Sequence, residues 1–489
     1  MLDRLYQILA YDPASPLLFN TGLFMLLFVL FLLLYNSLHG HPKAKKVAAI
    51  LFSAYFYYKS SASCVFILLG VCLSDYLLGL WLGRTVRDGL RRLIVALNVV
   101  INVGMLVWFK YFNLLADAFA SMVSTHFDPL DIVLPAGISF FTFRSISYMV
   151  DLYRHRLEPC RNLLDYTFFL TFFPPLLAGP VVRAADMLPQ IEQAPRPTRE
   201  MCSEGLFLIM IGLVKKVAIA DYISGNFVDR IFDNPMLYSG FENLMGCIGF
   251  TIQLYCDFSG YSDMAIGIAL LLGYRFKDNF MAPFKAQSPT EFWHRWHISL
   301  STWLRDYVYI PLGGNRKGRA RAYVNQFITM VIGGLWHGAS WMYLLWGAYH
   351  GLLLAAHKAI KQVWHLPESL KGHPLIVGAN VVATFALVVL GFTFFRATTP
   401  EIAGQIFTQI FTNFHASVAP QFVQGYLLIV VAMAIGLAAH LSPRAWTTSA
   451  SQVYINMSVV WQTLLLAAVL FIVIQMRQTD LVPFIYLQY

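Results

Sequence analysis

Charged side chains are scarce in this chain. Asp, Glu, Lys and Arg make up only 12% of its 489 residues, whereas 58% of the residues are hydrophobic. An average soluble domain carries about 25% charged residues, so this composition excludes an ordinary soluble domain and indicates a membrane protein. The formal net charge is +9. In a membrane protein Lys and Arg gather in cytoplasmic loops, so this excess predicts topology and does not indicate nucleic-acid binding.

Cysteines are few, and the common nucleotide and hydrolase motifs are missing. The six cysteines include no CxxC pair, which argues against a disulfide framework and against a zinc site. No GxSxG, P-loop or GxGxxG occurs, so the marks of a hydrolase, an ATPase or a dinucleotide-binding enzyme are absent from the sequence. We expect no metal and no bound cofactor, and no cofactor-binding residue is predicted.

Long apolar runs are what the sequence has in abundance. No charged residue occurs between Asp12 and Lys43, between Glu401 and Arg444, or between Arg444 and Arg477. A helix crosses a bilayer with about 20 largely apolar residues, and such runs predict an all-α membrane protein with about ten to twelve transmembrane helices. The first run is too long for a secretory signal and lacks a cleavage site before Lys43, so we expect a retained helix.

Clusters of basic residues indicate which side of the membrane each loop occupies, and prolines and glycines indicate where a helix is interrupted. Lys43–Lys46 and Arg84–Arg92 are separated by two apolar spans, which places both clusters in the cytoplasm and the N-terminus outside. Proline and glycine interrupt the run FFPPLLAGPVVR at residues 172–183. Irregular backbone at membrane depth is tolerated only where it is buried in protein or lines a cavity. A kinked, packed helix and a segment that shapes a funnel both remain open.

Two pairs of charged residues stand at the ends of apolar runs. Lys215 and Lys216 follow GLFLIMIGLV, and we expect them at the cytoplasmic end of a helix. Asp257 and Asp263 are six residues apart, a spacing that points two side chains of a helix in different directions. We therefore expect these carboxylates to cap helices or line a pore, and not to form an acid/base pair.

Histidines and tryptophans are concentrated between Glu291 and Trp346. A helix over Glu291–Asp306 would place His297 at the border of an aromatic face. The face contains Trp293, Trp296, Leu300 and Trp303. His337 lies in a stretch without formal charge, from Ala322 to His357. An imidazole at that depth costs free energy unless it is partnered or functional, so His337 is a candidate site residue.

The residues alone leave three interpretations of these histidines. His294 and His297 have an i, i+3 spacing that could bind a metal, although no HExxH, cysteine pair or clear carboxylate partner accompanies them. Other histidines could be hydrogen-bonded core residues, which suits His350, His357, His415 and His440. His337 also has the chemistry of a general base, because imidazole titrates near neutrality. Composition by itself would favour a transporter.

Long motifs resemble the bacterial membrane-bound O-acyltransferase family. They are LYCDFSGYSDMAIG, NFMAPFKAQSPTEFWHRWHISLSTWLRDYVYIPLGG and GGLWHGASW, with LPAGISFFTFRSISYMVDLYR and FFPPLLAGPVVR upstream. The nearest subgroup is similar to the alginate O-acetyltransferase membrane subunits and their peptidoglycan- and cellulose-acetylating relatives. The resemblance implies one integral membrane domain over residues 1–489, with a motif-bearing core at 130–350. It also implies a ring of helices, with re-entrant and interfacial helices, around a central funnel.

The resemblance assigns roles to two of the histidines. His337, in the WHG span, corresponds to the catalytic histidine of the family, and His297, in WHISLS, to its companion. His294 stands where the family commonly has arginine, so no catalytic role is carried over to it.

The C-terminal tail, residues 483–489, reads PFIYLQY. It is similar to the aromatic C-terminal motif of small single-span proteins that partner the D-alanyl-transferring members. That resemblance implies Tyr486 as an acyl intermediate, although the chain ends in Tyr489 where phenylalanine is more usual. An aromatic tail without a catalytic role is the alternative.

Together these features predict a multi-pass O-acyltransferase of the bacterial inner membrane. We expect it to move an acetyl group from a cytoplasmic thioester, acetyl-CoA or an acyl carrier protein, to an extracytoplasmic polysaccharide such as alginate. A periplasmic acetyltransferase is the expected partner. The basic loop Arg316–Arg321 would attract an anionic donor, or would serve topology alone. D-alanyl transfer, and a transporter or channel, are the alternatives.

Overall fold

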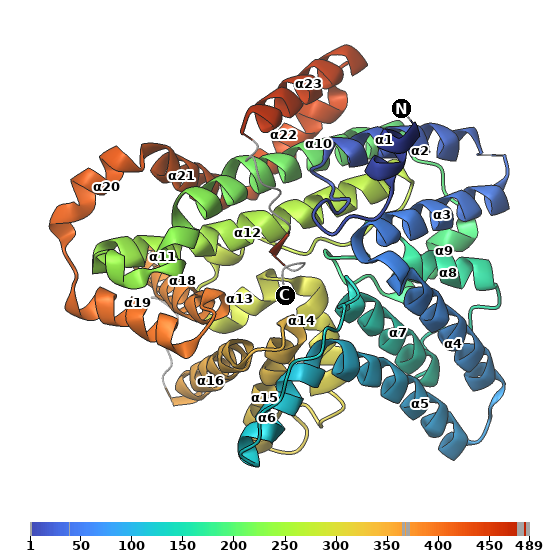
Figure 1. The fold of residues 1–489 in the computed structure, drawn as a ribbon, viewed down its shortest axis with the longest axis horizontal. Helices are drawn as coiled ribbons and strands as arrows, with labels where there is room; N and C mark the ends of the chain where they lie inside the picture. Colours follow the sequence, from blue (N-terminus) through green and yellow to red (C-terminus); the bar gives the residue numbers. More distant parts are fainter. Residues whose placement is uncertain (1, 39, 364–366, 368–371, 477–483, 486–489) are drawn as a thin grey trace. The chain divides into compact units, whose positions relative to one another are not determined.

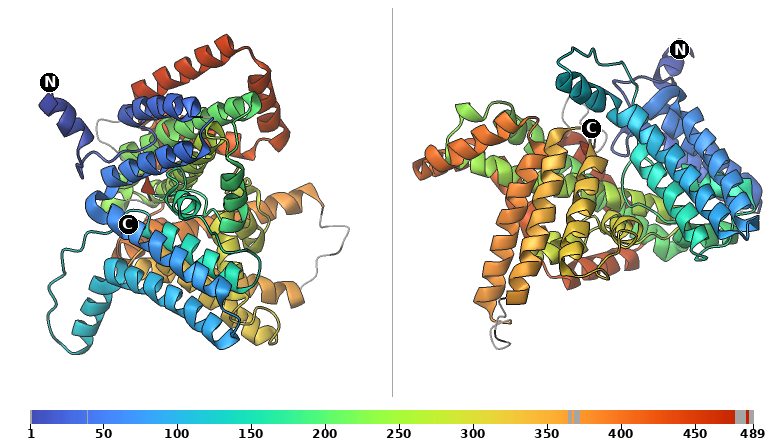
Figure 2. Two further views of the ribbon diagram at one scale, coloured as in Figure 1. Left: turned by 90° about the vertical axis from the view of Figure 1, so that its right-hand side faces the viewer. Right: turned by 90° about the horizontal axis from the view of Figure 1, so that it is seen from below.

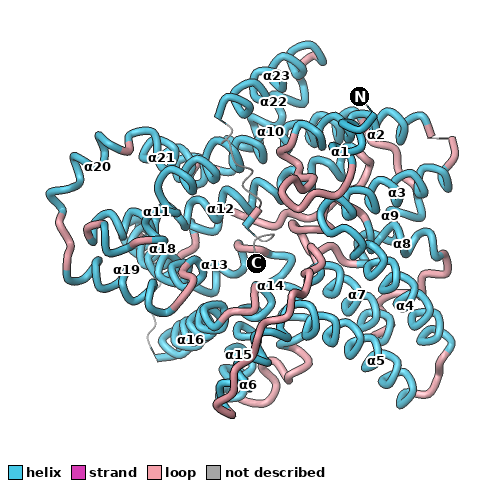
Figure 3. The backbone as a smooth tube through the Cα atoms, in the orientation of Figure 1, coloured by secondary structure: helices cyan, strands magenta, loops and turns pink. Residues whose placement is uncertain are grey.

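The computed structural model describes residues 2–38, 40–363, 367, 372–476 and 484–485. These residues form helices joined by turns and loops, with no β-strand among them (Figure 3). The all-α class predicted from the sequence is therefore confirmed. The chain divides into two compact units: Met1–Leu206 with Met264–Phe276, and Phe207–Asp263 with the residues from Lys277 onward. The expectation of a single domain stays a prediction.

Four helical stretches of the described residues are long and apolar enough to cross a membrane. They are Pro42–Arg84, Asp88–Met122, Pro374–Arg396 and Val459–Met476. A fifth is possible if Ala416–Gly425 and Leu427–Leu441, which meet at a bend of 96°, count as one broken span. Several apolar helices thus agree with a membrane protein, while the count of ten to twelve spans stays a prediction.

The first unit is built from the N-terminal helices (Figures 1 and 2). They are α1 (Leu2–Leu9), α2 (Gly22–Ser37), α3 (Pro42–Ser61), α4 (Val65–Arg84), α5 (Asp88–Leu106), α6 (Phe112–Met122), α7 (Ile138–Tyr153), α8 (Leu163–Thr171) and α9 (Ala184–Gln193). Helices α4, α5, α7 and α8 pack together around the buried Asp75. Its carboxylate accepts hydrogen bonds from Asn98, Ser145 and Tyr166 at 2.7–2.9 Å. Three donors on one carboxylate offset the cost of burying it.

The proline-rich segment after α8 is irregular and buried. Arg144 of α7 donates hydrogen bonds to the carbonyl oxygens of Phe169 and Leu170, at the end of α8, and of Pro175. Gly137, at φ +69°, lies so close to this segment that a Cβ there would be 2.4 Å from the carbonyl oxygen of Leu176. The helix end at Thr171 is therefore stabilised by packing and by a buried guanidinium, as expected for irregular backbone inside a protein.

The second unit contains the remaining helices (Figure 1). They are η3 (Val214–Asp221), η4 (Ser224–Val228), α11 (Asp229–Asp233), α13 (Pro289–Arg295), α14 (Ile298–Leu304), η7 (Arg305–Tyr309), α15 (Arg319–His337), α16 (Trp341–Val363), α18 (Pro374–Arg396), α19 (Pro400–Thr412), α20 (Ala419–Gly425), α21 (Leu427–Leu441), α22 (Arg444–Asn456) and α23 (Val459–Met476). Helices α10 (Arg199–Leu213) and α12 (Gly240–Leu271) each have residues in both units. Short 3-10 turns complete the set.

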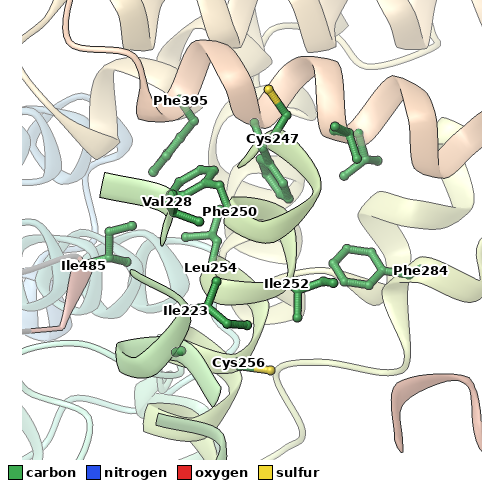
Figure 4. Close-up of a cluster of buried hydrophobic side chains, with 14 of the residues drawn as sticks. Ile223, Val228, Cys247, Phe250, Ile252, Leu254, Cys256, Phe284, Phe395 and Ile485 are labelled. Atoms are coloured by element: carbon green, nitrogen blue, oxygen red, sulfur yellow. The ribbon is translucent and has the colours of Figure 1, made fainter. Parts of the chain in front are cut away.

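One apolar cluster fills the interior of the second unit (Figure 4). It draws side chains from η3, η4 and α12, from α18, and from the end of the chain at Ile485. Figure 4 shows Phe250, Leu254 and Ile485 among these side chains. Ile485 belongs to this core although it is among the last residues of the sequence, and Phe484 before it is also buried.

Two lysines that follow α10 do not lie at a helix end. The helix continues as the π-helix η3, and Lys216 is fully buried. Its Nζ is 2.5 Å from Oδ1 of Asp257 and 2.8 Å from Oδ1 of Asp221. The expected end-of-helix role is therefore wrong for Lys216. The expected helix-capping role is wrong for Asp257 and Asp263, because both lie inside α12, where Asp257 pairs with Lys216 and Asp263 pairs with Lys215, at 2.7 Å. Their expected pore-lining role stays a prediction.

Helices α15 and α16 approach each other closely because glycines face the contact. A Cβ on Gly334 would lie 2.2 Å from the carbonyl oxygen of Tyr343, and a Cβ on Gly347 would lie 2.6 Å from that of Met330. Small residues permit this backbone contact between helices. The contact fixes the end of α15, where His337 is the last helical residue.

Candidate active site

His297 occupies a break between two short helices. Ser288 caps α13, its Oγ accepting the N–H of Glu291 at 3.2 Å, and α13 ends at Arg295. His297 then adopts the left-handed conformation, with φ +42°, and α14 begins at Ile298. The single helix predicted over Glu291–Asp306 is therefore wrong. A non-glycine residue in this conformation costs about 1–3 kcal/mol, and such residues concentrate at functional sites.

The imidazole of His297 is completely buried and held in one orientation. Its Nδ1 is 3.2 Å from Oδ1 of Asn279, an oxygen that also accepts from Oγ of Ser299 at 2.8 Å. Because an amide oxygen only accepts, Nδ1 carries the proton and the basic lone pair is on Nε2. Burial lowers the pKa of His297 to about 3, so the ring is neutral at physiological pH. A neutral imidazole with a defined tautomer can accept a proton or orient a hydroxyl.

His337 lies in an aromatic cage at the end of α15. Its ring centroid is 4.9 Å from that of Trp336, 4.9 Å from that of Trp346 on α16, and 5.1 Å from that of Phe395 on α18. Only 6% of the residue is exposed. Gly338 ends the helix, and a Cβ there would be 2.2 Å from the ring of Tyr343. Three helices thus position an imidazole that the sequence marked as buried.

The two histidines meet at Trp336. The ring of Trp336 contacts His337 and also lies 5.8 Å, centroid to centroid, from the ring of His297. Phe258 of α12 packs edge-on against the other side of His297 at 4.6 Å. The structure therefore brings together two predicted site residues that are 40 positions apart in the sequence. The third, Tyr486, lies outside the described residues.

His294 does not join this cluster. It is exposed, whereas His297, three residues later, is completely buried, so the two imidazoles do not form a pair. Within the described ranges, no group of three or more His, Cys, Asp or Glu side chains is arranged to hold a metal. The i, i+3 spacing fails as a metal motif because the helix breaks between the two positions.

His350, Trp293 and Trp346 lie beside the histidine cluster, and none of them was assigned a role in the site from the sequence. His350 and Trp346 are 99% buried, and neither ring nitrogen of His350 nor Nε1 of Trp346 has a hydrogen-bond partner in the described structure. The same holds for Nε1 of Trp293, whose ring is 5.7 Å from that of Trp346. His350 had been grouped with hydrogen-bonded core histidines, and that expectation is wrong for it. Its i, i+4 spacing to Trp346 was the available signal.

The other three histidines of that group have hydrogen-bond partners. His440 Nε2 accepts the N–H of Phe284 at 2.9 Å, and Nδ1 of His357 is 3.0 Å from Oγ1 of Thr290. His415 is exposed and bonds Asn413. These residues fit the expected non-catalytic role in part: His440 is buried, while His357 lies at the edge of a cavity.

A cavity of about 780 Å³ adjoins the break between α13 and α14. Its lining includes Trp293, Ile298 and Ser301. It also includes three cations of η7 and α16: Arg305, Lys358 and Lys361. The loop Arg316–Arg321, expected to attract an anionic donor, contributes none of the lining residues of this cavity. Pockets for small molecules span about 300–1,000 Å³, so the cavity has room for a substrate.

Comparison with known proteins places this arrangement in a family. The sequence model of the membrane-bound O-acyltransferase family matches residues 160–399, which include His297 and His337. The chain is also 40% identical over 407 residues to the protein of Pseudomonas syringae pv. tomato named Probable alginate O-acetylase AlgI, covering 81% of this chain and 75% of that protein. The chain belongs to the membrane-bound O-acyltransferase family.

Two further relatives show the range of the membrane-bound O-acyltransferase family. The Peptidoglycan O-acetyltransferase of Helicobacter pylori is 35% identical over 432 residues, 82% of this chain and 80% of that protein. The Teichoic acid D-alanyltransferase of Bacillus subtilis is 27% identical over 289 residues, 57% of this chain and 72% of that protein. The protein is thus a membrane enzyme, an O-acyltransferase whose more similar relatives are named for O-acetylation. An acyl donor is one of its substrates.

Proposed function

We propose that this enzyme moves an acetyl group from a cytoplasmic thioester to an extracytoplasmic polysaccharide, with His337 as the general base. The observation that carries the proposal is the convergence of His337 and His297 on Trp336. Ile298, the residue after His297, lines the cavity described above. Acyl transfer to a hydroxyl needs a base that takes up the hydroxyl proton and a cavity large enough for the donor.

In the proposed reaction His337 accepts the proton of the attacking hydroxyl. The hydroxyl oxygen forms a bond to the thioester carbonyl carbon, the C–S bond breaks, and the departing thiolate takes up the proton from His337. His297, neutral and fixed through Asn279, orients the hydroxyl or the donor. Trp346 and His350 supply buried hydrogen-bonding groups near His337 that a bound acyl group could engage.

The donor in this proposal is acetyl-CoA or an acetylated carrier protein. Arg305, Lys358 and Lys361 line the cavity, and a cluster of cations favours the phosphates of such a donor. Asp306 pairs with Arg305 at 2.7 Å, which leaves the two lysines as the cations best placed for phosphate. D-alanine in place of acetate is the second candidate, since one relative is named a D-alanyltransferase.

The acceptor side of the proposal follows from the tail and the relatives. The first acceptor is Tyr486, which forms an aryl ester, and a periplasmic acetyltransferase then takes the acetyl group on a serine and passes it to the polysaccharide. Alginate is the first candidate polymer, because the relative reported above at 40% identity carries that name. The bacterial inner membrane is the location that this route requires.

The decisive experiment measures the rate at which labelled acetyl groups are transferred. Purified protein is reconstituted in proteoliposomes, and labelled acetyl-CoA is added outside. His337→Ala is expected to lower the rate of label incorporation about 10²–10⁴-fold, the usual contribution of a general base. His415→Ala, which changes an exposed histidine, is the matched control and should retain the wild-type rate. If His337→Ala transfers acetyl groups at the wild-type rate, His337 is not the general base. Labelled D-alanyl carrier protein in place of acetyl-CoA separates the two donors.

A further inference from the structure

The last described residues of the chain are held in the interior of the second unit. Phe484 is 1% exposed and Ile485 is 5% exposed. Residues near a chain end are usually poorly ordered unless specific contacts hold them. Here the contacts include charged groups that no step of the proposed reaction uses.

Ile485 and Phe484 both contact one buried ion pair. The N–H of Ile485 donates to Oδ2 of Asp257 at 3.0 Å, while Oδ1 of the same carboxylate accepts from Lys216 Nζ at 2.5 Å. Lys216 Nζ also lies 4.6 Å from the centroid of the Phe484 ring. The other partner of Phe484 is Tyr261, whose ring it meets edge-on at 4.2 Å. The two residues thus bind through a main-chain hydrogen bond, a cation–π contact and an aromatic contact.

Lys216 lies between two carboxylates. Its Nζ pairs with Asp257 and with Asp221. Lys216 and Asp221 are five residues apart on η3, where side chains of an α-helix would be offset by about 140°. The i→i+5 geometry of a π-helix brings them to one side. A hydrogen bond from N–H to a buried carboxylate is stronger than one between neutral groups.

The same stretch of α12 connects this cluster to the catalytic histidines. Asp257 and Tyr261 hold the end of the chain, and Phe258 between them packs on His297 at 4.6 Å. These positions fall within about one helical turn, roughly 6 Å along the axis. The tail contact and the histidine contact are therefore on one rigid element.

We propose that Asp257 and Lys216 form an internal receptor for Phe484 and Ile485, and that acetyl transfer to Tyr486 depends on their hold on Ile485. The inference rests on the proposed function, in which Tyr486 accepts the acetyl group. Asp257 and Lys216 are positioning residues, since they act through the tail and not on the acetyl group.

A second lysine–aspartate pair on the same two elements gives the control. Lys215 of η3 pairs with Asp263 of α12 at 2.7 Å, and Asp263 has no other hydrogen-bond partner among the described residues. Removing that pair perturbs the η3–α12 contact without touching Phe484 or Ile485. Asp263→Asn therefore reports what the loss of an ion pair does by itself.

The first experiment measures how firmly the tail is held. Full-length protein in detergent micelles is digested with carboxypeptidase Y, and intact-mass spectrometry follows the removal of Ile485 and Phe484. Asp257→Asn and Lys216→Met should lose these residues at least ten-fold faster than wild type, whereas Asp263→Asn should match wild type. Lys216→Arg should restore protection in part, since it keeps the charge. Equal trimming of Asp257→Asn and wild type overturns the receptor.

The second experiment measures positioning. Acetylation of the C-terminal peptide is followed by mass spectrometry in proteoliposomes supplied with acetyl-CoA. Asp257→Asn should lower the maximal rate at least ten-fold and leave the KM for acetyl-CoA unchanged. Ile485→Pro removes the N–H donor and keeps Tyr486. If the two residues act through one hydrogen bond, the double variant is no slower than the slower single variant. The proposal is overturned if the effects of Asp257→Asn and Ile485→Pro on the rate multiply in the double variant. It is also overturned if Asp257→Asn changes the KM for acetyl-CoA and leaves the maximal rate unchanged.

The two readouts separate this inference from the function on which it rests. If wild-type Tyr486 is never acetylated although Ile485 is protected, the proposed function fails and the positioning role fails with it. If Tyr486 is acetylated at the same rate in wild type and in Asp257→Asn, the proposed function stands and the receptor alone is overturned.

Discussion

The imidazole of His297 is defined by its neighbours on both sides. Asn279 fixes the proton on Nδ1, and Phe258 and Trp336 enclose the ring. Asn279 is itself oriented, because its Nδ2 donates to Ser262 Oγ at 3.3 Å. The left-handed backbone of His297 turns the side chain into this cage. A histidine placed in this way stays neutral at a pH at which solvent-exposed histidines are protonated.

Acidification should therefore destabilise the folded enzyme through His297. Burial lowers its pKa to about 3, whereas an unfolded chain has the ordinary value of 6.5, so only the unfolded state gains a proton as the pH falls below 6.5. Between pH 7 and pH 5 this group should cost about 2 kcal/mol of stability. Thermal unfolding in detergent measures the effect.

His297→Gln provides the comparison for that pH dependence. Glutamine does not titrate, so the variant should lose less stability between pH 7 and pH 5 than wild type, by about the same 2 kcal/mol. Identical pH dependence of the two proteins would contradict a neutral, buried His297.

Two features at the scale of helices position the histidines. The break between α13 and α14 places His297, and the close contact of α15 with α16 places His337. The contact depends on glycine, because at Gly347 even a methyl group would meet the backbone of α15. Displacing α15 would move the imidazole at its end.

Gly347→Ala should lower both stability and acetyl transfer. The added Cβ would lie 2.6 Å from the carbonyl oxygen of Met330, so α15 must shift, at a cost of about 1–3 kcal/mol for overpacking. We expect a reduced unfolding temperature and at least ten-fold slower transfer. Gly378→Ala on α18 is the matched control, because no atom lies within 4 Å of its added Cβ. Alanine favours a helix, so that control should be neutral or slightly stabilising. An active, stable Gly347→Ala would show that the close contact is dispensable.

At the scale of the whole molecule, the distribution of cations decides where a donor would bind. The net charge of +9 fits a membrane protein and says nothing of a site. In the structure Lys358 and Lys361 line the cavity, whereas the residues Arg316–Arg321 do not. The donor-attracting role expected for that loop thus passes to α16 in the proposal.

Reversing the charge of the cavity lysines should weaken donor binding. The variant with Lys358→Glu and Lys361→Glu is expected to raise the KM for acetyl-CoA at least ten-fold and to change the maximal rate little, because the two lysines line the cavity whereas His297 and His337 do not. Steady-state kinetics in proteoliposomes at fixed ionic strength measures both constants. Arg319→Glu with Arg321→Glu, at the end of the basic segment and in the first turn of α15, changes the charge by the same amount and should leave the KM unchanged. A larger effect from the loop variant would return the donor site to Arg316–Arg321.

The sequence by itself determined the class of the protein and its family. Scarce charge and long apolar runs require an all-helical membrane protein, because only helices and closed barrels satisfy every backbone group in lipid. The motifs around His297 and His337 then indicated an acyltransferase, and the burial of His337 followed from its charge-free surroundings. These are local properties, read from composition and from short stretches.

Only the tertiary structure decided the partners of each polar group. A helix pattern over Glu291–Asp306 gave no sign that the chain would break at His297, since that strain persists only where packing from α12 and α15 holds it. The sequence placed Lys216 at a helix end because its two partners could not be recognised from the pattern. Asp221 is brought to it by a π-helix, and Asp257 is 41 residues away on another helix. Sequence patterns report the period of one element. Buried charges, and ring nitrogens without a hydrogen-bond partner such as those of His350, depend on which elements meet.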